Sequence, residues 1–242
     1  MKRLLMAGAV ALAAATQAFA ADLPPPMAPP PRAPAAYIPV SPAYNWSGFY
    51  LGLNTGYGFG DSTWTAPGFS SGSFAVNGAM AGATLGWNYQ IGQLVLGIEG
   101  DYDWQNLRGA NNGGVCTLAN SGGNLSGCAT SSNWYGTFRG RLGYAMDRIM
   151  VYATAGGAVS DIKASTAAQS WSSNTALGWA AGAGIEGAIT DNLTAKVEYL
   201  FTDYGNSTCS AASCTLTGIA SPSVKFYENM VRAGLNYKFT GF

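Results

Sequence analysis

The sequence predicts an all-β fold: an eight-stranded antiparallel transmembrane β-barrel with short periplasmic turns and long outer loops. Eight segments alternate apolar residues with polar residues or glycine, their connections alternate in length, and aromatic residues gather at the segment ends. The composition agrees, because 10% charged residues and 33 glycines in 242 residues suit neither an ordinary soluble surface nor a helical protein.

The first twenty residues are typical of a secretory signal peptide. Lys2 and Arg3 precede an apolar core over residues 4–15, and residues 18–20 (Ala-Phe-Ala) supply a small-x-small cleavage site. The core is shorter than the roughly 20 apolar residues of a spanning helix, so we expect cleavage rather than a retained anchor. No later stretch is long and apolar enough for such a helix, so we expect either a soluble exported protein or a barrel.

Residues 21–45 are predicted to be a proline-rich periplasmic linker, and residues 46–242 the barrel domain. Nine of the chain's eleven prolines fall in this linker. Such density favours extended polyproline II and removes amide donors. A proline-rich ligand for a binding groove is the alternative interpretation.

The first four alternating segments are residues 46–60, 78–89, 94–104 and 133–144. In the first, every second residue from Phe49 to Phe59 is apolar or threonine, with mostly glycine between. The second alternates alanine, leucine and aromatic residues with a set rich in glycine. The third places Leu, Ile, Tyr and Trp opposite three carboxylates, and the fourth sets two arginines against Trp, Phe, Leu and Tyr. Opposite charges on one side of facing strands can pair.

The last four segments, residues 149–159, 176–188, 194–205 and 224–239, repeat this pattern. Each again has one face of apolar residues and one that is polar or glycine-rich. Ten charged residues of the third to eighth segments fall on that second face. They are Glu99, Asp101, Asp103, Glu186 and Glu198, balanced by Arg139, Arg141, Lys196, Arg232 and Lys238.

These charges favour a barrel over a soluble β-sandwich, which also alternates. A sandwich turns charges to water and buries its apolar face, whereas a barrel in lipid turns the apolar face outward. Residues 90–93, 145–148 and 189–193 are predicted tight turns, and 61–77, 105–132, 160–175 and 206–223 long outer loops. Aromatic residues at both segment ends predict two girdles at the membrane boundaries.

The ten charged residues are a candidate network inside the barrel. Eight strands enclose a space that side chains nearly fill, so we expect a plugged or very narrow lumen. Glycines on the inner face would leave water-sized gaps, so a minor channel, with the charges as its selectivity filter, is the alternative.

Four cysteines lie in the two longest predicted loops. Outside the cytoplasm, local disulfides Cys116–Cys128 and Cys209–Cys214 are favoured among the three possible pairings. A metal site is the weaker alternative, because the chain has no histidine. The same loops are rich in Ser, Asn, Thr and Gly, which suits either surface recognition or an inert hydrated surface.

Several motifs in order resemble a known family. They are Ala21-Asp22-Leu23-Pro24, Trp46-Ser47-Gly48-Phe49-Tyr50, Arg139-Gly140-Arg141-Leu142-Gly143-Tyr144, Lys196-Val197-Glu198-Tyr199-Leu200 and Gly234-Leu235-Asn236-Tyr237-Lys238-Phe239. Over the whole mature chain the sequence resembles the porin-family outer-membrane proteins of alphaproteobacteria, often called outer-membrane immunogenic proteins (the RopB type). The resemblance implies a small barrel in the bacterial outer membrane, in contact with lipid and lipopolysaccharide.

The resemblance also implies two partners. In the last segment, Arg232, Gly234, Tyr237 and Phe239 resemble the signal that the barrel-assembly machinery reads, although Phe242 competes with Phe239 for the terminal role. Relatives with this mature start can be joined to peptidoglycan through the N-terminal amine, which here is that of Ala21, followed by Asp22. Alanine there is also what signal peptidase ordinarily leaves.

Catalytic motifs were not found in the sequence. There is no histidine to act as a base, and no nucleophile elbow, phosphate-binding loop or metal-ligand cluster. We therefore expect no enzyme, cofactor or metal, and the formal charge of zero gives no reason to expect a nucleic-acid partner. The sequence favours a structural and surface protein supporting envelope integrity. The alternatives are a narrow passive porin, and an adhesive or ligand-binding barrel for haem or host surfaces.

Overall fold

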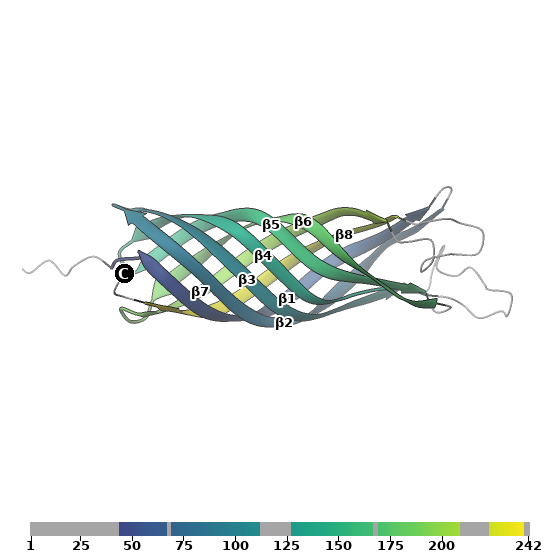
Figure 1. The fold of residues 1–242 in the computed structure, drawn as a ribbon, viewed down its shortest axis with the longest axis horizontal. Helices are drawn as coiled ribbons and strands as arrows, with labels where there is room; N and C mark the ends of the chain where they lie inside the picture. Colours follow the sequence, from purple (N-terminus) through teal and green to yellow (C-terminus); the bar gives the residue numbers. More distant parts are fainter. Residues whose placement is uncertain (1–43, 67–68, 112–126, 167–168, 209–222, 240–242) are drawn as a thin grey trace, which may run out of the picture. The chain divides into compact units, whose positions relative to one another are not determined.

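The alternating pattern folds into eight antiparallel strands that close into a barrel (Figure 1). The computed structural model describes residues 44–66, 69–111, 127–166, 169–208 and 223–239. The signal peptide and all but the end of the predicted linker lie outside these ranges. The strands are β1 (Gly48–Ala66), β2 (Phe69–Ile91), β3 (Leu94–Asn111), β4 (Cys128–Met146), β5 (Ile149–Thr166), β6 (Gln169–Ala188), β7 (Leu193–Thr208) and β8 (Ser223–Lys238).

Each strand pairs with the next, and β1 also pairs with β8 from Tyr50↔Lys238 to Thr65↔Ser223. Closure leaves no unpaired edge, which lipid requires. Large apolar side chains point outward, among them Leu53 at 71% exposure and Phe138 at 67%, while polar neighbours such as Asn54 and Arg139 are buried inside. The predicted fold class and the direction of its faces are confirmed. Among the residues described, no helix is long and apolar enough to cross a membrane.

Turns of two residues join β2 to β3 and β4 to β5. Their first residues, Gly92 and Asp147, have φ of 61° and 53°. A positive φ at that position suits a two-residue hairpin, because such turns match the strand twist. The β6–β7 turn, residues 189–192, lies at the same end. We assign this end to the periplasm because the two longest connections, residues 112–127 and 209–222, are at the other end, and barrels carry their longer loops on the outside.

Two of the predicted long loops are wrong. Residues 61–66 and 69–77 continue β1 and β2, with Gly60↔Val76 and Thr63↔Ser73 in register, and residues 160–166 and 169–175 likewise continue β5 and β6. The described outward side chains there are mostly polar, among them Asp61, Thr63 and Lys163, so the apolar alternation fades although the backbone ladder continues. The other two predicted loops are shortened by strands that reach Asn111, Cys128, Thr208 and Ser223.

Shifts of register interrupt the ladder only in the outer half of the described strands. In β4 the shift falls between Ser132 and Tyr135. The amides of Asn133 and Trp134 in this bulge donate to Asp161 Oδ1 of β5 at 2.8 and 3.0 Å. The carboxylate thereby satisfies donors that the ladder leaves over.

Candidate functional site

The barrel interior is packed in three layers. Nearest the periplasm lies an apolar layer that includes Trp46, Val95 and Met150. A layer of charged side chains follows, which we call the ionic layer, and beyond it lies a larger apolar layer that includes Leu107, Leu200 and Phe226. Apolar packing on both sides removes the ionic layer from water, so its charged groups must pair with one another.

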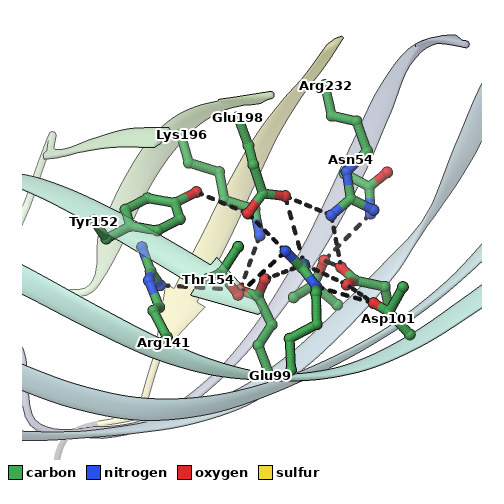
Figure 2. Close-up of polar contacts among 12 residues, drawn as sticks. Asn54, Glu99, Asp101, Arg141, Tyr152, Thr154, Lys196, Glu198 and Arg232 are labelled. Atoms are coloured by element: carbon green, nitrogen blue, oxygen red, sulfur yellow. Dashed lines mark hydrogen bonds and ion pairs between the residues drawn. The ribbon is translucent and has the colours of Figure 1, made fainter. Parts of the chain in front are cut away.

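Arg139 of β4 is one centre of the ionic layer. Its Nη2 donates to Glu99 Oε1 and Asp101 Oδ2, both at 2.6 Å, and its Nη1 donates to Glu198 Oε1 at 3.0 Å. Figure 2 shows these three carboxylates converging from β3 and β7. Hydrogen bonds between an ionised guanidinium and ionised carboxylates are stronger than those between neutral groups, so these three contacts hold Arg139 firmly.

Arg232 of β8 is a second centre. Its Nη1 donates to Asp103 at 2.8 Å, and its Nη2 donates to Asp101 at 3.3 Å and to Glu198. Asp101 and Glu198 therefore each bridge both arginines. Through the two arginines, β8 is joined to β3 and β4 is joined to β7, although these strands are not neighbours in the barrel.

Toward the periplasm the layer continues through Arg141, Lys196 and Glu186. Lys196 Nζ donates to Glu99 at 2.9 Å, which crosses the barrel from β7 to β3. Arg141 donates to Glu186 and lies 3.7 Å from the centroid of the Tyr152 ring. The charges and the cation–π contact place a compact polar plug across the middle of the lumen.

Lys238 is a correction to the predicted network. Its side chain points inward, but its ammonium donates to the carbonyl of Asn45 and lies 4.1 Å from the centroid of the Tyr44 ring. Within the described residues it pairs with no carboxylate, because it sits at the periplasmic mouth, below the ionic layer. The expected balance of five against five is thus five carboxylates against four cations in contact.

Glu228 of β8 is a buried carboxyl that the sequence reasoning missed. It is 0% exposed, and neither oxygen accepts a hydrogen bond in the described structure. The signal was available, since 228 has the same parity as the inward residues 230 and 232.

Glycines on the inner face do not leave the gaps expected from sequence. A Cβ on Gly86 would lie 2.3 Å from Tyr50 Oη, and one on Gly184 would lie 2.5 Å from Tyr152 Oη. Tyr50 in turn donates to Glu99 at 2.7 Å. The space beside these glycines is therefore occupied by tyrosines that reach across to the ionic layer.

The last residues before β1 close the periplasmic mouth. The Trp46 indole donates to the carbonyl of Asp147 at 3.0 Å, and the Tyr44 amide donates to Asp147 Oδ1 at 3.1 Å. Asp147 lies in the β4–β5 turn, on the opposite side of the barrel from β1. The Trp46 amide is held by Gln90 Oε1 at 2.7 Å. Burial raises the pKa of Tyr44 to about 12, so its phenol stays neutral at physiological pH.

Several predicted site residues lie outside the described residues: Ala21, Asp22, Cys116, Cys209, Cys214 and Phe242. Cys128 is disulfide-bonded, and its pairing with Cys116 stays a prediction. Of the predicted assembly residues, Arg232 belongs to the ionic layer and Gly234 faces inward beside Asn54. Tyr237 and Phe239 face outward at the periplasmic rim, with ring centroids 5.3 Å apart. In the described parts of the chain, no three His, Cys, Asp or Glu residues are placed to hold a metal.

Comparison with known proteins agrees with this architecture. Residues 4–239 match the family described as outer membrane protein beta-barrel domain. The chain is 34% identical over 245 residues to the 25 kDa outer-membrane immunogenic protein of Brucella abortus, covering 99% of each chain. It is 35% identical to the 31 kDa outer-membrane immunogenic protein of Brucella melitensis (99% and 100% covered), and 35% identical to the 22 kDa outer membrane protein of Rhizobium leguminosarum (85% and 83%).

Among solved structures, neisserial surface protein A is similar at 15% identity and a TM-score of 0.44, with 80% of this chain and 98% of that chain covered. The relatives match in sequence over almost the full chain, so the resemblance drawn from the motifs is confirmed. The chain therefore belongs to the outer membrane protein beta-barrel family and is a protein of the bacterial outer membrane.

Proposed function

We propose that this protein is a non-enzymatic structural and surface protein that supports envelope integrity. In this proposal the barrel is an anchor in the outer membrane, and residues 21–45 are a tether bonded to peptidoglycan through the amine of Ala21. The observation that carries the proposal is the fastening of Tyr44 and Trp46 across the periplasmic mouth.

The fastening suits a load-bearing attachment. A pull on the linker reaches the barrel through Trp46, which is 2% exposed and holds the β4–β5 turn and β2 together with β1. Between Ala21 and Tyr44 lie 23 residue steps, which in polyproline II reach about 70 Å. That reach lets a cell-wall bond form without drawing the barrel out of the membrane.

The packed interior supports an anchor over a conduit. Buried carboxylates contact guanidinium and ammonium groups instead of an open passage, with apolar layers above and below. These pairs join β3, β4, β7 and β8 and stiffen the barrel against deformation. Each cation in the ionic layer contacts a carboxylate and is therefore already paired. For this reason we assign the layer no catalytic role.

The second partner in the proposal is the barrel-assembly machinery. The barrel-assembly machinery would read the end of β8, with Phe239 as its terminal aromatic residue, because the Phe239 amide still continues the ladder by donating to the Phe49 carbonyl at 2.9 Å. We expect Phe239→Ala to slow the appearance of folded barrel in the outer membrane more than Phe242→Ala, measured by pulse-chase and gel mobility. The reverse order would assign the signal to Phe242.

The tether is tested by mass spectrometry of muropeptides from detergent-boiled, trypsin-treated sacculi of the native host. A muropeptide bonded to a peptide starting at Ala21 is the expected result. The tether is refuted if Ala21 occurs only as a free amine while the protein is abundant in the membrane. Deleting residues 24–34 would shorten the tether by about 34 Å, and we expect that variant to shed more outer-membrane vesicles than the full chain.

Planar-bilayer recordings of the purified barrel distinguish the anchor from a porin. We expect no conductance steps from the wild-type chain. Regular steps that shift their ion selectivity in Glu99→Gln would instead support a narrow passive porin. A Soret band retained through purification would support a haem-binding barrel.

A further inference from the structure

A basic hollow lies on the outer face of β3, β4 and β5, away from the barrel interior. It has a volume of about 650 Å³, and its lining includes Arg108, Ser131, Asn133 and Lys163. Arg108↔Ser131 and Ser131↔Lys163 are direct partners in the ladder, so the three residues form one row across the strands. Neighbouring strands lie about 4.8 Å apart, which sets the two cations on either side of Ser131 with about 10 Å between their Cα atoms.

Both cations face away from the lumen. Arg108 is exposed next to Leu107, which is 0% exposed and points inward, and Lys163 lies between the buried residues Ile162 and Ala164. The other residues that line the hollow are uncharged and either small or polar. The row therefore presents positive charge to whatever surrounds the barrel at this height.

Arg108 is not neutralised by the protein. Its Nε donates to Asn106 Oδ1 at 2.8 Å, and it forms no ion pair within the described residues. The undescribed outer segments, residues 67–68, 112–126, 167–168 and 209–222, contain no Asp or Glu. No carboxylate from those segments can pair with this guanidinium.

Lys163 is only partly neutralised. Its Nζ lies 3.2 Å from Asp161 Oδ2, while Asp161 Oδ1 is occupied by the bulge amides of Asn133 and Trp134. The ammonium keeps two further donors, and its side chain is 28% exposed. Together with Arg108, the hollow has one unpaired positive charge and several free N–H donors, which suits a phosphate.

The position of the hollow relative to the membrane indicates what can reach it. The outer aromatic girdle on these strands is formed by Tyr102, Trp104 and Trp134, with Tyr102 stacked on Trp134 at 5.9 Å. Arg108 follows Trp104 by four residues, which places it about 10 Å above the girdle at the usual rise and tilt of barrel strands. Aromatic girdles mark the boundary of the hydrocarbon, so the hollow lies at the level of the outer headgroups.

We propose that Arg108, Lys163 and Ser131 form a binding site for a headgroup phosphate of lipopolysaccharide in the outer leaflet. The site is distinct from the ionic layer and does not depend on the tether. It would fix lipid at one side of the barrel, over β3–β5.

The test uses the full mature chain in nanodiscs, titrated with bisphosphorylated lipid A. We expect the double variant Arg108→Gln, Lys163→Gln to weaken binding by about tenfold or more, the size of one strong charged contact. Lys225→Gln is the matched control, because Lys225 is an exposed cation on the outer part of β8, outside the hollow, and should change affinity less than about twofold. The charge-preserving variant Arg108→Lys, Lys163→Arg should retain binding.

Two further arms identify the ligand. Enzymatically dephosphorylated lipid A should bind the wild-type chain about as weakly as the double variant binds the phosphorylated form. Millimolar inorganic phosphate should not displace the lipid. Equal binding by all variants, equal binding of dephosphorylated lipid A, or displacement by free phosphate would each overturn the proposal. Unchanged gel mobility of the variants confirms that they fold.

Discussion

Glu99→Gln tests whether the ionic layer holds the barrel together. Glu99 is 1% exposed and accepts from Arg139 at 2.6 Å, Lys196 at 2.9 Å and Tyr50 at 2.7 Å. Glutamine keeps the shape of the side chain, but its amide nitrogen is a hydrogen-bond donor and would face the donor groups that now bind the carboxylate. Lys196, 2% exposed, also loses the one carboxylate it contacts in the described structure.

Removing one partner of a buried ion pair costs about 3 to 5 kcal/mol, because the remaining charge stays buried and unpaired. With a urea dependence of about 2 kcal/mol per molar, the unfolding midpoint should fall by about 2 M. The assay is reversible urea unfolding of the barrel in phospholipid vesicles, followed by tryptophan fluorescence and gel mobility in both directions.

Glu228→Gln is the matched control, the same substitution at a buried carboxyl whose oxygens accept no hydrogen bond. The Glu228 carboxyl has no hydrogen bond to lose, and an amide of the same shape replaces it without leaving a partner unpaired, so the midpoint should stay or rise. The reasoning is refuted if Glu99→Gln moves the midpoint by less than about 0.3 M. It is equally refuted if Glu228→Gln lowers the midpoint as much as Glu99→Gln does.

Two further predictions concern packing and the disulfides. Gly86→Ala should cost about 1 to 3 kcal/mol in the same urea assay, because the new Cβ would meet Tyr50 at 2.3 Å. Gly157→Ala, with nothing within 4 Å of its Cβ, should cost nothing. Non-reducing tryptic digestion should keep each cysteine pair inside one peptide, residues 109–139 and 197–225. A mass joining these two peptides would contradict the local pairing.

Strand count and the facing of each side chain could be read from the sequence. In a strand the side of each residue is fixed by backbone geometry at period two, so Glu99 and Arg139 could be placed inside without coordinates. Because β3 and β4 follow each other in the chain and were expected to pair, Glu99 and Arg139 could also be predicted to lie close together. Where the outward residues lost their apolar character, as after Gly60, the same pattern gave no warning that the strand continues.

The sequence by itself thus determined the barrel, the face of each strand that turns inward and most of the charges in its interior. Only the tertiary structure decided which charges meet. Lys196 reaches Glu99 across the lumen, Lys238 turns instead to Asn45, and Glu228 is left without a hydrogen-bond partner in the described structure. The physical reason is that facing depends on the local geometry of one strand, whereas contacts across the lumen depend on the closure, stagger and diameter of the whole barrel.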